Sequence, residues 1–309
     1  RPPFPEGFRN EGQVIAYGNS LTATATALNN SGTLEAGTNT SLTTTGDVAN
    51  TGLIYAAGGT AIGGANVYNA GGQIGAGSGS LTVSTGMLDN TDNGRIAATS
   101  GMMALTADTL DNAGGLIDSA GDLTVLTGSL DNGSGKILSD HGNLLIDATA
   151  DGAALSSVNN SFGLLQAGRD QTLRTATLTN SNGQIITVSG NLTLTGGPGM
   201  TALQSVDDTN GVLQSGQDLT LAVNSLTGAS GLSATRDLSF STAQSVSGAM
   251  MFSAGHNAML AIGGDYSIAA GSGVIAGGDA TVSAASVTNA GAMMAGGTLS
   301  VSTPGALYN

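Results

Sequence analysis

The segment Leu110–Val125 reads LDNAGGLIDSAGDLTV and decides the fold. It holds a Leu-x-Asn triplet, a glycine turn, and two short runs in which apolar or small residues alternate with polar ones. This alternation has the period of a β-strand, and the Gly-Asp pair between the runs indicates a turn. No helical stripe of apolar residues competes with this pattern. The unit is therefore a set of two or three short strands joined by turns.

The same unit recurs about every twenty residues along the whole chain. A unit of this length cannot bury its apolar face alone, so successive units must stack. Stacking pairs equivalent strands in parallel, roughly 4.8 Å apart. The sequence predicts an all-β fold, a parallel β-helix (solenoid) of about fifteen coils, as one continuous domain over residues 1–309. The apolar residues that start the units are Phe8, Leu28, Val48, Val67, Leu88, Leu110, Leu130, Val158, Leu178, Val206, Leu226, Val246, Tyr266, Val287 and Leu307.

The recurrent asparagine is predicted to be structural. An amide at the same place in successive coils can donate to one neighbour and accept from the other, which forms a ladder. The ladder weakens after Asn180, where Asp208, Gly228 and Gly248 replace the asparagine. Its predicted members are Asn30, Asn50, Asn69, Asn90, Asn112, Asn132, Asn160, Asn180 and Asn289.

Two further expectations concern the turns and the interior. The glycine after the ladder asparagine is expected to have positive φ, which glycine adopts without strain. The interior is expected to hold Leu, Val, Ile, Met and Ala and to be too narrow for large aromatic side chains, which are 3% of the chain and include no Trp. The turn glycines are Gly12, Gly32, Gly52, Gly71 and Gly163.

Composition excludes several functions. The formal net charge is -14 with only seven Lys and Arg residues; nucleic acid and anionic lipid surfaces are not expected partners, because both require clustered cations. No apolar run is long enough to span a membrane. The chain has no cysteine, which suits a protein that crosses a membrane pore unfolded. Both ends of the sequence cut through the repeat, which predicts a piece of a longer rod.

The acidic residues favour structural roles over catalysis and metal binding. A β-helix glycan-cleaving enzyme needs carboxylates close together on one face, and Asp207-Asp208 is the one adjacent acidic pair. Neighbouring strand residues point to opposite faces, so a turn role is favoured. No catalytic residue, cofactor or metal site is predicted. The turn aspartates, stacked at one corner, offer a calcium site in principle, but Asx turns are the simpler interpretation. They are Asp122, Asp170, Asp218, Asp237, Asp265 and Asp279.

The repeat is interrupted twice, by longer segments at residues 147–157 and 195–205. Such insertions are expected to loop out of the stack, and loops on a rigid scaffold often carry recognition residues. The candidate recognition residues are Asp151 and Gly152 in the first loop, and Gly197 and Pro198 in the second.

The frame L-x-N-x-G-x-I-x-A-G-x-x-L-x-L, seen in Leu110–Val125, resembles the haemagglutinin-type repeats of filamentous haemagglutinin and the contact-dependent inhibition exoproteins. The resemblance covers essentially all 309 residues. It implies a right-handed β-helix, secretion through an outer-membrane two-partner transporter, and display at the bacterial cell surface.

The resemblance also implies what the segment does. It would serve as a fibrous rod and as an adhesive surface for a receptor or glycan on host cells, matrix or other bacteria. Two alternatives remain open at this point. One is a β-helix carbohydrate-active enzyme, and the other is a pure spacer in a protein that delivers a contact-dependent toxin.

Overall fold

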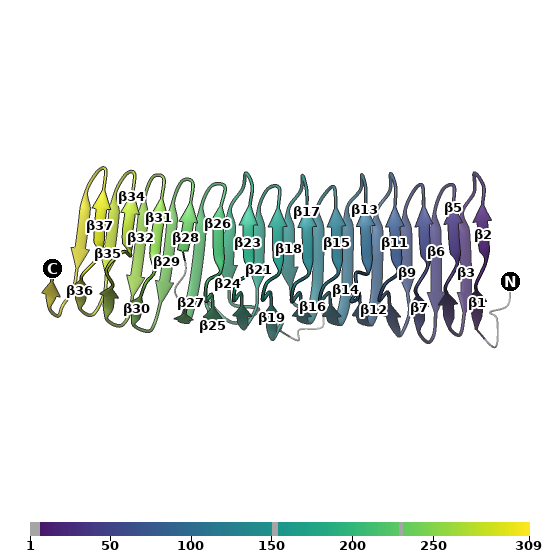
Figure 1. Ribbon diagram of the computed structural model, residues 1–309, viewed down its shortest axis with the longest axis horizontal. Helices are drawn as coiled ribbons and strands as arrows, with labels where there is room; N and C mark the ends of the chain where they lie inside the picture. The colour runs from purple at the N-terminus through teal and green to yellow at the C-terminus, as the bar shows by residue number, and fades with distance from the viewer. Residues whose placement is uncertain (1–6, 150–153, 229–230) are drawn as a thin grey trace. The chain divides into compact units, whose positions relative to one another are not determined.

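A computed structural model describes residues 7–149, 154–228 and 231–309. The chain divides into two compact units, Arg1–Leu155 and Ser156–Asn309. In each unit the chain winds through short strands that pair in parallel with their counterparts in the next coil (Figure 1). The predicted all-β parallel β-helix, about fifteen turns of about twenty residues, is confirmed. One continuous domain over residues 1–309 stays a prediction. No helix among the described residues is long and apolar enough to cross a membrane.

In the first unit, the strand after each asparagine turn contributes to one parallel sheet. Its members are β2 (Gln13–Ala16), β5 (Thr33–Ala36), β8 (Leu53–Ala56), β11 (Gln73–Ala76), β13 (Arg95–Ala98), β15 (Leu116–Ser119) and β17 (Lys136–Ser139). The other sides of the coils are β1 (Phe8–Asn10), β3 (Leu21–Ala25), β4 (Leu28–Asn30), β6 (Thr40–Thr44), β7 (Val48–Asn50), β9 (Thr60–Gly63), β10 (Asn66–Tyr68), β12 (Leu81–Asp89), β14 (Met103–Asp111), β16 (Leu123–Asp131) and β18 (Leu144–Asp147).

The second unit repeats this plan. The sheet after the asparagine turn holds β20 (Leu164–Ala167), β23 (Gln184–Thr187), β26 (Val212–Ser215), β28 (Gly231–Ala234), β31 (Met251–Ala254), β34 (Gly273–Ala276) and β37 (Ala292–Ala295). The other sides are β19 (Ser157–Asn159), β21 (Gln171–Arg174), β22 (Thr177–Thr179), β24 (Leu192–Thr195), β25 (Leu203–Asp207), β27 (Leu219–Thr227), β29 (Leu238–Thr242), β32 (Ala258–Ile262), β35 (Ala280–Ser283) and β38 (Leu299–Ser302). A separate sheet holds β30 (Val246–Gly248), β33 (Tyr266–Ile268), β36 (Val287–Asn289) and β39 (Leu307–Tyr308).

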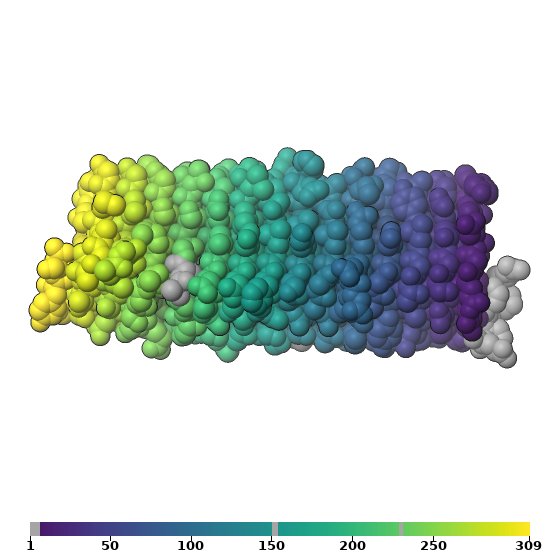
Figure 2. Space-filling model, in the orientation of Figure 1, coloured from purple at the N-terminus to yellow at the C-terminus, as the bar shows by residue number. Residues whose placement is uncertain are grey.

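Strict register stacks the apolar residues of each coil on those of the next. Leu110 pairs with Leu130, and Ile117 with Ile137; all four are at most 3% exposed. Alternate residues along each strand face outward, which accounts for the period of two in the sequence. Within each unit, the visible face is a succession of such coils in contact (Figure 2).

The repeat asparagine points into the interior and links coil to coil. Its Nδ2 donates to the Oδ1 of the next ladder residue, so an amide such as that of Asn50 or Asn112 both donates and accepts. The ladder asparagines from Asn30 to Asn180 are 0% exposed. The first-unit bonds are Asn10 to Asn30, Asn30 to Asn50, Asn50 to Asn69, Asn69 to Asn90 and Asn90 to Asn112 at 2.7 Å, and Asn112 to Asn132 at 2.8 Å. Those of the second are Asn160 to Asn180 at 2.7 Å and Asn180 to Asp208 at 2.6 Å in the interior, and Asn289 to Asn309 at 2.6 Å, which is exposed.

The ladder amide also serves the backbone. Nδ2 of Asn112 donates to the carbonyl oxygen of Lys136, 3.1 Å away in the next coil, and lies 3.4 Å from that of Gly115 in its own turn. Leaving a buried polar group without its partner costs about 1–3 kcal/mol. The amide of one coil is therefore satisfied only if the next coil carries a side-chain oxygen at the same position, and an asparagine there can also donate onward, which explains why the sequence repeats it.

Changing Asn112 to Asp tests the ladder. The carboxylate keeps the shape and still accepts from Asn90, but it sets an oxygen against Oδ1 of Asn132 where the amide had donated. We expect the free energy of unfolding, measured by urea denaturation, to fall by about 2–4 kcal/mol. The matched control is Asp111→Asn at the neighbouring position, where Oδ1 accepts from the N–H of Ala113 at 3.0 Å. The amide oxygen that replaces the carboxylate in this variant would also accept that bond, so the free energy of unfolding should fall by about 0.5 kcal/mol or less. Equal losses of stability in the two variants would contradict the ladder.

The turn glycines follow a different rule from the expected one. Gly71 has a positive φ of 69°, as predicted. The prediction was wrong for the other four, Gly12, Gly32, Gly52 and Gly163, which do not have positive φ. A Cβ atom on Gly32 would lie 2.0 Å from the carbonyl oxygen of Gly12 in the adjacent coil. At this position, close approach of successive coils is what requires glycine.

The interior of the second unit contains large aromatic rings, so the expectation of an aromatic-free interior was wrong. Phe240 and Phe252 are 0% exposed and Tyr266 is 2% exposed. The ring centroids lie 5.0 Å apart for Phe240 and Phe252, and 6.2 Å apart, edge to face, for Phe252 and Tyr266. The three rings come from β29, β31 and β33, and together form one aromatic cluster.

This aromatic cluster lies where the ladder amide is missing. The register pairs Asp207 with Thr227, the residues just before Asp208 and Gly228, and it pairs Gly248 with Ile268. Gly228 is half-buried and Gly248 is exposed, so neither places a side chain in the interior, and aromatic rings in contact are worth about 0.5–1.5 kcal/mol beyond their buried area. These coils therefore use ring packing where the others use amide hydrogen bonds.

The hydroxyl of Tyr266 gives a test of this packing. It is buried without a hydrogen-bond partner among the described residues, and burial raises the pKa of this phenol. Removing it in Tyr266→Phe should raise the free energy of unfolding by about 1 kcal/mol, because an unpaired buried hydroxyl is costly. Phe252→Ala should lower it by about 3–5 kcal/mol. Urea denaturation measures both; destabilisation by Tyr266→Phe would show that the hydroxyl has a partner.

Candidate recognition groove beside residues 196–202

The second predicted loop is a compact turn. Between β24 and β25 the chain folds back on itself: the N–H of Met200 donates to the carbonyl oxygen of Gly197 at 2.9 Å, and Gly199 has a φ of 78°. Gly197 is buried and Pro198 is exposed. The strands resume their register after the turn, so the extra residues are absorbed without disturbing the stack.

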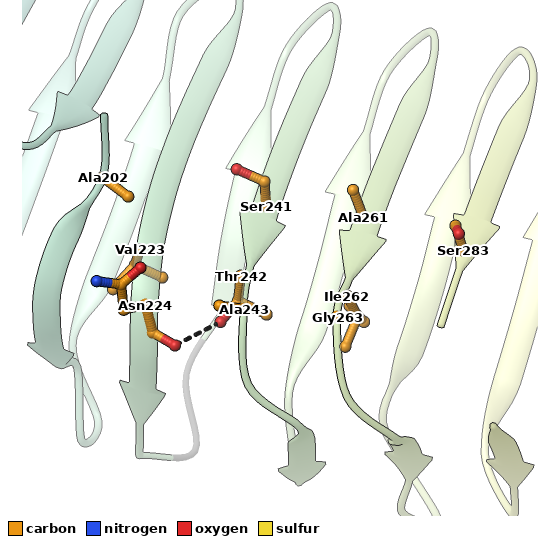
Figure 3. Close-up of a pocket in the computed structure, with 10 residues that line it drawn as sticks. All are labelled: Ala202, Val223, Asn224, Ser241, Thr242, Ala243, Ala261, Ile262, Gly263 and Ser283. Carbon is orange, nitrogen blue, oxygen red and sulfur yellow. Dashed lines mark hydrogen bonds between the residues drawn. The ribbon is translucent and has the colours of Figure 1, made fainter. Parts of the chain in front are cut away.

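A shallow groove of about 460 Å³ begins at this turn (Figure 3). Ala202, the last residue before β25, forms one end. Strands β27, β29, β32 and β35 carry the rest of the lining across successive coils. The groove is lined by Ala202, Val223, Asn224, Ser241, Thr242, Ala243, Ala261, Ile262, Gly263 and Ser283.

Small side chains make the groove. Ser241, Ala261 and Ser283 occupy outward positions in successive coils, and Ala243 and Gly263 follow the strands. One internal hydrogen bond, from Thr242 Oγ1 to the carbonyl oxygen of Asn224 at 3.0 Å, joins two coils in the floor. No lining residue is ionisable. The surface offers methyl groups and hydroxyls without charge, which suits an uncharged ligand such as a neutral sugar or a peptide main chain.

The first predicted loop is only partly within the described residues. Asp151 and Gly152, its two candidate recognition residues, lie outside them. At the near end of the loop, Oδ1 of Asp147 accepts a hydrogen bond from the N–H of Ala148 at 2.8 Å. Leu155, at the far end, is 0% exposed.

Asp207 and Asp208 have separate surroundings. Asp208 is 0% exposed and accepts from Asn180 in the interior ladder. Asp207 lies at the surface, where Oδ1 accepts from the hydroxyl of Thr209 at 2.7 Å and Oδ2 from that of Ser181 at 3.1 Å. The pKa of Asp207 lies below its usual range, mainly because of the hydrogen bond from the hydroxyl of Thr209. A general acid at neutral pH requires a raised pKa, so Asp207 is unsuited to that role.

The turn aspartates form a second ladder, which sequence reasoning missed. A side-chain oxygen accepts from the backbone N–H of the equivalent residue one coil on, rather than forming the expected Asx turn. In the first unit, Asp122 accepts from the N–H of Asn143 at 2.8 Å. In the second unit, the accepting side chain and the donating N–H of each bond are Asp170 and Asn191 at 2.8 Å, Asn191 and Asp218 at 3.2 Å, Asp218 and Asp237 at 3.1 Å, Asp237 and Asn257 at 2.9 Å, Asn257 and Asp279 at 3.0 Å, and Asp279 and Thr298 at 2.7 Å. The sequence signal that could have revealed this ladder is an Asp or Asn directly before a strand.

Asp265, the remaining turn aspartate, bonds to a side chain of the next coil. Asp265 accepts from the hydroxyl of Ser286 at 2.6 Å. Asx turns occur instead one residue before the interior asparagine, as at Asp111, whose Oδ1 accepts from Ala113. Within the described ranges, no three His, Cys, Asp or Glu side chains are grouped as metal ligands.

The second ladder predicts a pH dependence. Arg236 lowers the pKa of Asp218, and the N–H of Asn257, followed by His256, lowers that of Asp237. A carboxylate whose pKa is lowered in the folded state contributes stability that is fully present above its ordinary pKa of 3.8. This stability is lost as the pH falls through the lowered pKa of the folded state. Thermal unfolding followed by circular dichroism should therefore give a falling midpoint below that pH. Asp237→Asn should have a smaller drop; an identical drop would exclude a contribution from Asp237.

A stack of short parallel strands with an interior amide ladder defines a β-solenoid of about twenty residues per coil. The haemagglutinin repeat family matches residues 12–92, 75–157, 141–196, 201–257 and 253–309, and the chain belongs to this family. No curated protein and no solved structure matches it. The resemblance drawn from the repeat is confirmed; members of the family are secreted surface proteins of the filamentous haemagglutinin type.

Proposed function

We propose that this chain is a segment of a large secreted adhesin or exoprotein displayed on a bacterial surface, where it serves as rod and as binding surface. Membership of the haemagglutinin repeat family is the observation that carries the proposal. The interior hydrogen bonds run from coil to coil, as a rod requires. Export through an outer-membrane two-partner transporter is part of the proposal, and a chain without cysteine suits it.

The binding role is assigned to the groove beside residues 196–202. Here a break in the repeat lies beside a hollow on the outer surface. Its lining has no ionisable side chain, so the receptor group it takes is a neutral glycan or a peptide segment on a host cell, the matrix or another bacterium. No catalytic step is assigned to the chain.

Filling the groove tests the binding role. Purified chain is applied to cultured host cells, matrix proteins and bacterial cells, and bound protein is quantified. Ala261→Trp should reduce binding at least tenfold, because the indole occupies the hollow between Ser241 and Ser283. The matched control is Ala104→Trp, which places the same side chain on an exposed alanine of β14.

Each outcome distinguishes the alternatives. Equal binding by both variants would remove the groove from the proposal. Absence of binding by the unaltered chain, where the whole surface protein adheres, would favour a pure spacer in a toxin-delivery protein. Cleavage of a polysaccharide by the purified chain would favour the carbohydrate-active enzyme.

A further inference from the structure

A second hollow lies in the first unit, on the outer side of the sheet formed by β13, β15 and β17. It has a volume of about 410 Å³. Leu116 forms its floor, with Arg95 and Lys136 in the same strand position of the coils on either side. The hollow thus brings together two of the seven basic residues of a chain whose net charge is -14.

The hollow exists because the middle coil has no side chain at one turn position. Asn93, Gly114 and Ser134 all line it and all have positive φ, at 64°, 69° and 57°. A Cβ atom added to Gly114 would meet nothing within 4 Å. The glycine therefore leaves a space between the side chains of Asn93 and Ser134.

The two cations keep their hydrogen-bond donors for a ligand. The nearest carboxylate oxygen to Arg95 is that of Asp118 at 3.7 Å, beyond the roughly 2.7–2.9 Å of a charge-assisted hydrogen bond. Among the described residues, the Arg95 guanidinium donates no hydrogen bond and Lys136 forms no ion pair. Arg236 is the contrast, because both its Nε and Nη2 donate to Asp218.

Nearby acids limit the positive potential without closing the site. Asp118 lies beside Arg95 but does not line the hollow. Burial, and then the charge of Asp140, raise the pKa of Asp118, while Arg95 acts in the opposite direction. The long-range charge of the chain repels anions, so binding here depends on short-range contacts and is weak and sensitive to salt.

The N–H groups of the two glycines in the middle coil of the hollow are already used. The N–H of Gly114 donates to the carbonyl oxygen of Gly133, and that of Gly115 to the carbonyl oxygen of Asn112, both at 2.9 Å. These two N–H groups are not available to a ligand, so recognition is assigned to the side chains. These are two cations, an amide, a hydroxyl and the methyl groups of Leu116.

We propose that this hollow binds a carboxylate-bearing sugar. Arg95 and Lys136 hold the carboxylate, Asn93 and Ser134 reach the ring hydroxyls, and Leu116 contacts the C–H face of the ring. Guanidinium and carboxylate match in plane and in charge. The site lies in a different unit from the groove of the proposed function and takes a charged ligand, so it stands or fails independently.

Titration of the purified chain with glucuronate, followed by NMR shifts of its backbone amides, tests the proposal. Saturable shifts are expected at residues around Leu116, weakened by added salt, with at most a tenth of that affinity for glucose. Arg95→Gln and Lys136→Gln should each weaken glucuronate binding about tenfold or more. Gly114→Asn should abolish it by filling the hollow; asparagine tolerates positive φ, as Asn93 does in the preceding coil. Arg236→Gln is the charge-matched control and should bind as the unaltered chain does.

Several results would overturn the proposal. Inorganic sulfate binding as tightly as glucuronate would mean an anion site without sugar recognition. Glucose binding as tightly would remove the role of the cations. Undiminished binding by Gly114→Asn, with its folded spectrum retained, would place the ligand elsewhere, and so would equal weakening by Arg236→Gln.

Discussion

The hydrogen bond between buried asparagine amides of successive coils is the constraint on which the rest of the structure depends. An amide in an apolar interior must find both donors and acceptors, and here it finds them one coil away in each direction. This requirement sets the register of the strands. The register in turn places the same outward positions above one another, so every surface feature is repeated unless the sequence changes locally.

Where the amide is lost, the physical basis of the stack changes. Gly228 and Gly248 stand in the ladder position, and the rings of Phe240, Phe252 and Tyr266 fill the interior nearby. The corner ladder continues through these coils with Asp237 and Asn257. In these coils, hydrogen bonding by a side chain at the corner is therefore retained while the interior ladder is not, so the two can change independently.

The sequence predicted the features that repeat. The period, the strand alternation and the inward asparagine follow from residues such as Leu110, Asn112 and Ile117, because each must satisfy the same burial in every coil. The reason for Gly32 was not predictable, since a contact between coils depends on how closely they approach. The aromatic cluster was missed because it depends on how rings from three separate strands meet in the interior, which the repeat pattern does not give.

The outer sites were the least predictable. The break at residues 195–205 indicated a loop, but the groove beside it also requires small side chains at Ala261 and Gly263, which are far away in sequence. Arg95 and Lys136 are separated by two coils, and nothing local in the sequence joins them. Stacking creates such sites from positions about twenty or forty residues apart, so a known register is needed before they can be found.

Hydrogen exchange of the asparagine side-chain amides, measured by NMR, tests the central claim most directly. If the interior ladder holds the coils together, the Nδ2 protons of Asn90 and Asn112 exchange only when the unit unfolds, at least a thousandfold more slowly than those of the exposed Asn93. Exchange of the Asn90 and Asn112 protons at the rate of Asn93 would contradict the account. It would mean that the hydrogen bonds between the amides break without unfolding of the unit and do not hold the coils together.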